Sequence, residues 1–108
     1  MTRGFLVAGY AVVSLLGPCA ASGKPANRTA VVVVDKLAFG NVPSNLRVGD
    51  TVEWVNRDLF RHSATSASHF DVDLPPGARR RMVLRRPGAF AFLCKYHPGM
   101  KGTVKVSP

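Results

Sequence analysis

The 108-residue sequence predicts an all-β fold, a Greek-key antiparallel β-sandwich, and three observations favour this class. Short runs rich in β-branched and aromatic residues recur along the chain at close spacing. Residues typical of tight turns separate these runs. No stretch combines a helical periodicity of apolar residues with helix-capping residues. A chain of this length builds one modest domain, so we expect neither a second domain nor an α/β arrangement.

Seven strands are expected, and turn residues divide them. The turns include Gly49-Asp50, Pro75-Pro76-Gly77 and Arg86-Pro87-Gly88, in which proline fixes φ and glycine supplies positive φ. The clearest alternation of polar and apolar residues lies in the segment 51–56. The expected strands are Thr29–Val34, Leu46–Val48, Thr51–Asn56, Ser63–Thr65, Arg80–Leu84, Ala89–Cys94 and Gly102–Val106.

The apolar positions of these strands define a thin core. The core is expected to contain Val32, Val34, Phe39, Leu46, Val48, Val52, Trp54, Phe70, Leu84, Phe90, Phe92, Val104 and Val106. Glu53 and Asp58 have no carboxylate partner at an informative spacing, so we assign both to solvated faces. Small domains with a core of this size are often stabilised by a bound metal.

Residues 1–21 have the composition of a signal peptide. A basic start containing Arg3 precedes an apolar run over 5–17, which falls short of the ~20 residues that a membrane-spanning helix needs. Small residues follow, so cleavage is expected after Ala21 or Ser22, and Ala21 is taken as the last residue of the signal peptide. The protein is then exported to the periplasm, with residues 22–28 as a flexible lead-in and residues 29–108 as the folded domain. The mature chain has no segment expected to insert stably in a membrane.

Removal of the signal peptide changes the cysteine count. Cys19 is lost and Cys94 becomes the only thiol, so no intrachain disulfide can form. A single cysteine in an oxidising compartment is a liability unless it is buried, reactive or bound to metal. The alternative is that Cys19 is a lipid-attachment site, although the preceding Pro18 fits that reading poorly.

Three potential metal ligands stand on one short loop between the last two expected strands. Cys94, His97 and Met100 offer a thiolate, an imidazole and a thioether, a soft set that selects copper over calcium or magnesium. A fourth ligand must come from elsewhere in the chain. His62 is the best candidate, and His69 is its main rival. Met82 offers a competing thioether but stands among strand residues, where a core role fits better.

The motifs around these residues resemble those of the cupredoxin family, in particular its plastocyanin, amicyanin and pseudoazurin-like branch. The resemblance covers nearly the whole mature chain. It is carried by Gly49-Asp50-Thr51-Val52-Glu53-Trp54-Val55-Asn56, His62-Ser63-Ala64-Thr65-Ser66, Phe70-Asp71, Pro76-Gly77, Pro87-Gly88-Ala89-Phe90-Ala91-Phe92-Leu93-Cys94 and His97-Pro98-Gly99-Met100-Lys101-Gly102.

The resemblance implies a ligand set and a function. The family's ligands fall on His62, Cys94, His97 and Met100, which would hold one copper per chain, with His97 as the partly exposed ligand through which electrons pass. Such a site marks a type 1 (blue) copper protein that carries single electrons. The family commonly has asparagine directly after its first histidine ligand, whereas this chain has Ser63, whose hydroxyl can make a similar hydrogen bond but over a shorter reach.

The net charge of the chain narrows the kinds of molecule that it is expected to bind. The formal charge of +9 falls to +8 when Arg3 is removed, and a basic exported protein is expected to meet an acidic redox partner. Arg79, Arg81 and Arg85 would face one side of their strand, away from Met82, either as a solvated face or as a docking surface. We expect no nucleic acid, no enzymatic activity and a monomer. The alternative function is a copper carrier that binds the metal without shuttling electrons.

Overall fold

A computed structural model describes residues 4, 8–12 and 26–108 of the chain. Residues 26–108 fold into a two-layer sandwich, and no helix occurs among the described residues, which confirms the all-β class. The proposed signal peptide lies mostly outside the described residues. The strands are β1 (Thr29–Asp35), β2 (Ala38–Phe39), β3 (Leu46–Arg47), β4 (Thr51–Asn56), β5 (His62–Ser66), β6 (Phe70–Leu74), β7 (Arg79–Val83), β8 (Gly88–Leu93) and β9 (Lys101–Ser107).

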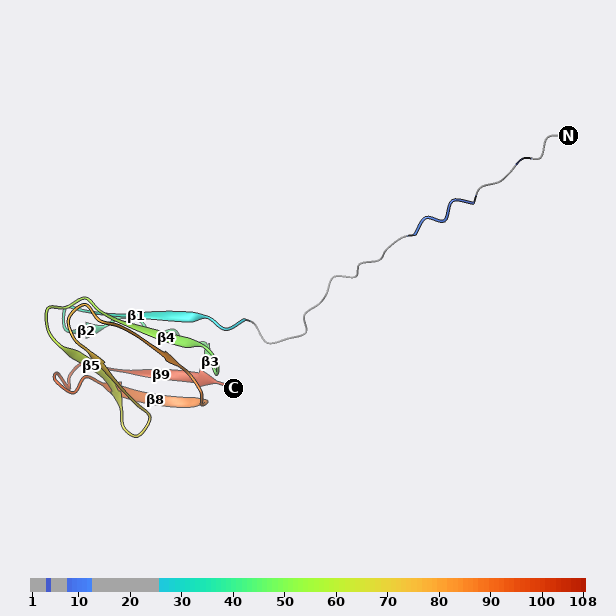
Figure 1. Cartoon of the computed structure of the whole chain (residues 1–108). Coiled ribbons are helices and arrows are strands. Elements are labelled where there is room, and N and C mark those ends of the chain that lie inside the picture. Colours follow the sequence, from blue (N-terminus) through green and yellow to red (C-terminus); the bar gives the residue numbers. More distant parts are fainter. Residues whose placement is uncertain (1–3, 5–7, 13–25) are drawn as a thin grey trace.

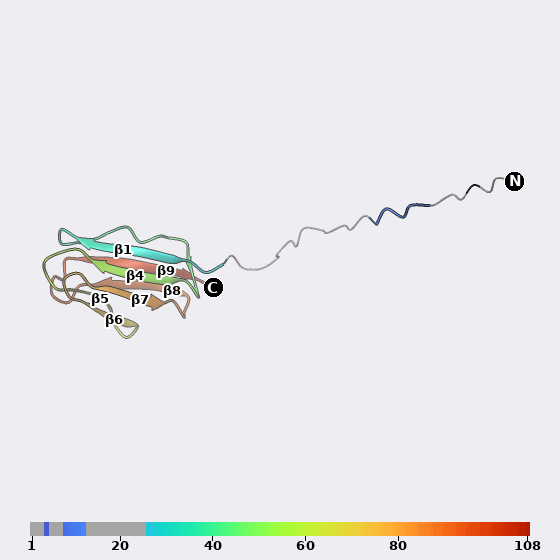
Figure 2. The same ribbon diagram turned by 45° about the horizontal axis from the view of Figure 1, so that its top comes forward.

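The two layers are a four-stranded sheet in the order β2-β1-β4-β7 and a five-stranded sheet in the order β3-β9-β8-β5-β6 (Figures 1 and 2). Most neighbours are antiparallel, but β1 pairs with β4 and β3 pairs with β9 in parallel. The sandwich is therefore mixed rather than purely antiparallel. The chain crosses into the other sheet at β3, so β4 enters the first sheet beside β1 in the same direction as β1.

Two of the nine strands were not expected from the sequence. Strand β2 follows a two-residue turn in which Lys36 and Leu37 have φ angles of 51° and 57°. Such hairpin turns usually contain glycine or asparagine, so neither residue signals the turn. Strand β6 does carry a signal, because its apolar residues alternate with Asp71 and Asp73. The turn glycines agree with expectation, since Gly49, Gly77 and Gly88 all have positive φ.

The core lies between the sheets, and its predicted members are confirmed. Each of them is either buried or packed against the buried cluster. Trp54 is fully buried and meets the rings of Phe39 and Phe92 edge-on, at centroid distances of 5.9 and 5.1 Å. Such aromatic contacts add to the stability that area burial provides. Trp54 therefore forms the centre of the structural core.

Glu53 corrects one expectation, because its residue is buried rather than solvated. Arg79 and Arg81 of the neighbouring strand donate to its two carboxylate oxygens at 2.8 and 2.7 Å. The Arg81 bond, followed by the Arg79 bond, holds the pKa of Glu53 below its usual value. The two arginines face the same side of β7, as expected from strand alternation, but they cover this carboxylate. Part of the predicted basic surface is thus neutralised internally.

Asp50 ties the start of the domain to the turn before β4. Its carboxylate accepts the backbone N–H groups of Arg28 and Arg47 at 3.0 and 2.9 Å. These bonds, with Arg28 the larger cause, hold the pKa of Asp50 below its usual value despite burial. The carboxylate is therefore a fixed acceptor at neutral pH. Within the described residues, no helix is long and apolar enough to cross a membrane.

Candidate metal centre

The loop between β8 and β9 is a closed turn that presents three of the predicted ligands. The backbone N–H of Cys94 donates to the carbonyl of Met100 at 2.9 Å, and that of Met100 donates to the carbonyl of His97 at 2.8 Å. These two bonds fix the ends of the loop against each other. The loop lies at the end of the sandwich opposite the C-terminus (Figure 1).

A second loop, between β4 and β5, is held by the buried Asn56. Its side-chain amide donates to the carbonyls of Phe60 and Leu74, each at 2.8 Å, and its carbonyl accepts the N–H of Asp58 at 2.9 Å. The side chain thus replaces backbone pairing over the segment where the chain leaves one sheet for the other. This arrangement sets the position from which β5 begins at His62.

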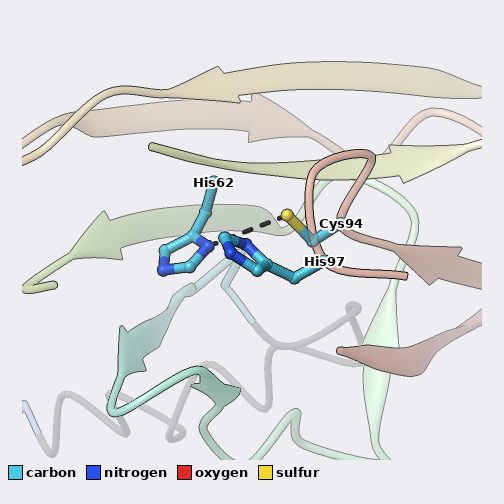
Figure 3. A group of neighbouring side chains, drawn as sticks. All are labelled: His62, Cys94 and His97. Carbon is cyan, nitrogen blue, oxygen red and sulfur yellow. Dashed lines mark hydrogen bonds between the residues drawn. The ribbon is translucent and has the colours of Figure 1, made fainter. Parts of the chain in front are cut away.

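His62, Cys94 and His97 converge at this end of the sandwich. One potential ligand atom from each lies within 4.8 Å of the others (Figure 3). His62 and Cys94 are fully buried, and the two imidazole rings are 5.1 Å apart between centroids. The structure therefore brings together residues separated by more than thirty positions in sequence. The histidine that joins Cys94 and His97 in this group is therefore His62 and not its rival His69.

A hydrogen bond sets the tautomer of the neutral His62 ring. Its Nε2 lies 2.7 Å from a carboxylate oxygen of Asp58, which can only accept, so Nε2 carries the proton. The other ring nitrogen, Nδ1, is left without a proton and lies 3.7 Å from the Cys94 sulfur. A neutral imidazole with an unprotonated nitrogen facing a thiol is the form that binds a metal ion.

Asp58 is the functional residue that sequence reasoning missed. It was assigned to a solvated face, yet its carboxylate also accepts the backbone N–H groups of Lys36 and Leu37 at 2.7 and 2.9 Å. The Leu37 bond, as the largest cause, and the His62 bond hold its pKa below the usual value against the effect of burial. The only sequence signal is a carboxylate four residues before the histidine. Asp58 thus joins the β1–β2 turn to the candidate site.

His97 has an unsatisfied nitrogen. Its Nδ1 is buried and has no hydrogen-bond partner among the residues that the structure describes, although the residue as a whole is partly exposed. Buried polar nitrogens are nearly always paired, so this one is explained by a group that the side chains around it would bind. The ring of Phe60, a residue that is 58% exposed, lies 6.3 Å from the His97 ring. His97 therefore connects the buried group to the surface.

Met100, Met82 and His69 are the other candidate ligands that the sequence offered. Met100 is buried, with 6% of its surface exposed, and its backbone is bonded to both Cys94 and His97. Met82 packs against the core, which agrees with its predicted role. His69 lies outside the ligand group, where its ring contacts Phe90 at 4.8 Å.

Ser63 links the two ligand-bearing segments. Its backbone N–H donates to the Cys94 sulfur at 3.4 Å, and its hydroxyl accepts the N–H of Lys95 at 2.9 Å. The side chain of Ser63, although shorter than the asparagine that is common in the family, therefore reaches the loop that carries Cys94. Both bonds restrain the cysteine, one at the sulfur and one at the following peptide group.

The donor set fits copper. One thiol and two imidazole nitrogens lie close together, one nitrogen is held unprotonated and another is buried without a partner. Thiolate and imidazole donors suit copper, and no carboxylate belongs to the group among the described residues.

An all-β sandwich with two histidines and a cysteine gathered at one end is the arrangement that the resemblance to the cupredoxins implies. No protein-family profile matches the chain. The chain is 26% identical over 97 residues to amicyanin from Paracoccus denitrificans, which covers 80% of this chain and 71% of that protein.

Solved structures of amicyanin have the same fold. A Cu(I) form of one methionine-to-alanine variant matches with a TM-score of 0.68 and 23% identity, covering 78% of this chain and 87% of that chain. The reduced Cu(I) form of another variant matches with a TM-score of 0.66 and 22% identity, covering 81% of this chain and 88% of that chain. These similarities show that the chain has the fold of the cupredoxins, and the particular protein that it resembles is amicyanin.

Proposed function

We propose that the protein is a periplasmic type 1 copper protein that carries single electrons between redox proteins, with one copper held by His62, Cys94, His97 and Met100. The observation that carries the proposal is the convergence of a thiol and two imidazoles within 4.8 Å, with Asp58 favouring the neutral His62 tautomer whose Nδ1 faces the thiol. Copper, when bound, supplies a couple between Cu(I) and Cu(II).

The residues around the site suit repeated electron transfer. His62 and Cys94 are anchored on strands or at strand ends, and Asp58 and Ser63 restrain them by hydrogen bonds. Because these groups are fixed before any metal binds, little has to move when the charge at the site changes. A site of this kind exchanges electrons quickly, so we propose an electron carrier rather than an enzyme.

His97 is the proposed point of electron entry and exit. It is partly exposed, and the exposed Phe60 and Tyr96 lie beside it in space and in sequence, respectively. Arg57 and Arg61 flank the loop that carries Phe60. Arg57 has no carboxylate within ion-pair distance in the described part of the chain. A partner with an acidic rim around an apolar contact would complement this surface, and steering of this kind weakens as salt rises.

The composition of the N-terminal residues supports export, and the burial of Cys94 agrees with a monomer. Residues 1–21 are proposed to be removed as a signal peptide, which would leave residues 29–108 as the copper domain in the periplasm. Cys94 would then be the only thiol and fully buried, so it would neither form a disulfide nor link two copies.

Addition of Cu(II) to the purified protein tests the proposal. We expect one equivalent to bind and to produce an intense visible absorption from charge transfer between the Cys94 sulfur and copper. Cys94→Ser should remove this absorption, and Thr103→Val, an exposed substitution, should leave it unchanged. A colourless Cu(II) complex of the unsubstituted protein would overturn the proposal. Copper transfer to a second protein without reversible redox cycling would favour the carrier alternative.

A further inference from the structure

The five-stranded sheet is weakly paired between the two strands that lead to the candidate site. Strand β5 starts with His62 and β8 ends just before Cys94, yet they share a single register pair, Thr65 with Leu93. By contrast, β8 and β9 pair along six positions. Backbone pairing alone therefore leaves the end of this seam, where the proposed ligands lie, with few restraints.

A ring of side-chain hydrogen bonds crosses the seam at this point. The backbone N–H of Lys95 donates to the Ser63 hydroxyl at 2.9 Å, and Ser63 and Thr65 share a hydrogen bond of 2.9 Å. Thr65 donates to one carboxylate oxygen of Asp71 at 2.9 Å. The ammonium of Lys95 donates to the other carboxylate oxygen of Asp71 at 3.0 Å, which closes the ring.

The direction of these hydrogen bonds depends on Asp71. A carboxylate only accepts, so the single hydroxyl proton of Thr65 is committed to Asp71. The Ser63 hydroxyl must then donate to Thr65, which leaves its oxygen free to accept from the Lys95 amide. Hydrogen bonds that run in one direction strengthen one another. Asp71 and Thr65 therefore fix the orientation of Ser63 without touching the proposed ligands.

We propose that Thr65 and Asp71 are positioning residues for the metal centre: through Ser63 they hold the Cys94–Lys95 peptide group and thereby the thiolate of Cys94. The inference rests on the proposed function for its copper readout and on the ring geometry alone for its metal-free readout. Ser63 acts at both ends, because its amide donates to the Cys94 sulfur while its hydroxyl holds the next peptide group. Hydrogen bonding around a cysteine sulfur tunes the potential of a copper site of this type.

The metal-free test is exchange of the Lys95 amide hydrogen, followed by NMR in the purified protein. Thr65→Val keeps the shape and charge and removes the hydroxyl. We expect it to speed exchange at Lys95 by about fivefold, the effect of losing roughly one hydrogen bond. Thr65→Ser should restore protection. Thr103→Val is the control, since Thr103 belongs to the same sheet, is more exposed than Thr65 and has a hydroxyl with no hydrogen bond within residues 26–108.

A substitution of Asp71 provides a second test in case Thr65→Val does not fold. Asp71→Ala should speed exchange at Lys95 in the same way, whereas Asp73→Ala should not, because Asp73 pairs with the half-exposed Arg61 at 3.8 Å and makes no hydrogen bond to Thr65 or Lys95. If exchange at Lys95 is the same in Thr65→Val as in Thr103→Val, or if Thr65→Ser fails to restore protection, the proposal is wrong.

The copper test is the reduction potential. Weaker donation from the Ser63 amide to the sulfur leaves more charge on the thiolate, which favours Cu(II). We expect Thr65→Val to lower the equilibrium constant for reduction about threefold, which is about 28 mV at 59 mV per tenfold for one electron. In a Ser63→Ala background, Thr65→Val should add nothing further, because it acts through Ser63. Additive effects would overturn the positioning role.

The two proposals fail in different ways. If the unsubstituted protein binds Cu(II) without the intense visible band, the proposed electron-carrier function is wrong. Exchange at Lys95 in the metal-free protein still decides whether Thr65 and Asp71 hold this peptide group.

Discussion

Substitution of Asp58 should change two quantities that can be measured separately, the stability of the metal-free protein and its affinity for copper. Its carboxylate accepts three hydrogen bonds, from the ring of His62 and from the backbone N–H groups of Lys36 and Leu37. The two backbone groups belong to exposed residues, so water can replace the carboxylate there. The Nε2–H of His62 is fully buried and has no other acceptor in the described structure.

Asp58→Ala should therefore lower the free energy of unfolding of the metal-free protein by about 2 kcal/mol, the cost of leaving one buried donor unpaired. The same change releases the His62 tautomer, because Nε2 is no longer favoured over Nδ1 as the site of the proton. Loss of such a partner typically weakens metal binding by about 10- to 100-fold. Denaturant titration of the metal-free protein and competitive copper titration measure the two effects.

Asp35→Ala is the matched control. Asp35 is exposed and accepts the same Lys36 N–H at 3.0 Å, but it does not contact His62. We expect this substitution to change stability by less than about 0.5 kcal/mol and copper affinity very little. If Asp58→Ala weakens copper binding no more than Asp35→Ala does, the Asp58 bond does not set the His62 tautomer, and the reasoning is refuted.

Three further predictions follow from the fold and the site. Because the folded-state pKa of Asp50 is lowered, its contribution to stability is present above the unfolded value of about 3.9 and is lost as pH falls through the folded value. Asp50→Asn should lower stability at pH 7 and flatten its loss below about pH 4 in thermal unfolding; a curve parallel to the unsubstituted one would contradict this. A Cβ on Gly102 would lie 2.6 Å from the ring of Phe92, so Gly102→Ala should cost about 1–3 kcal/mol in denaturant unfolding. Gly99→Ala, which meets no atom within 4 Å, should cost little, and equal stabilities would argue against the overlap. Met100→Gln should keep the visible absorption and lower the reduction potential; complete loss of copper binding would show a larger role for Met100.

Short-range features were the easiest to predict from the sequence. Cys94, His97 and Met100 stand within one loop, so their proximity follows from chain connectivity alone. Strand positions with clear alternation, and turns with glycine and proline, also matched the structure. These features depend on local chemistry, which the sequence states directly.

Features that depend on tertiary contacts were harder to predict. The place of His62 after a strand end and the family resemblance both favour this residue, but its separation from Cys94 by more than thirty residues does not by itself indicate contact. The turn at Lys36–Leu37 was missed since neither residue favours positive φ, and the Asp58 carboxylate stabilises it from a distant segment. The ring through Thr65 and Asp71 joins two strands and a loop, which no local pattern reveals.

The closed turn formed by Cys94, His97 and Met100 also affects how copper and folding are coupled. These three residues span seven positions, so bringing them together costs little chain entropy even before the sheets form. The unfolded chain can therefore still offer these three ligands to copper. Only His62 is added when β5 packs into the sheet. Since binding to the unfolded state offsets binding to the folded state, copper should stabilise the protein by less than the affinity of the complete site alone implies.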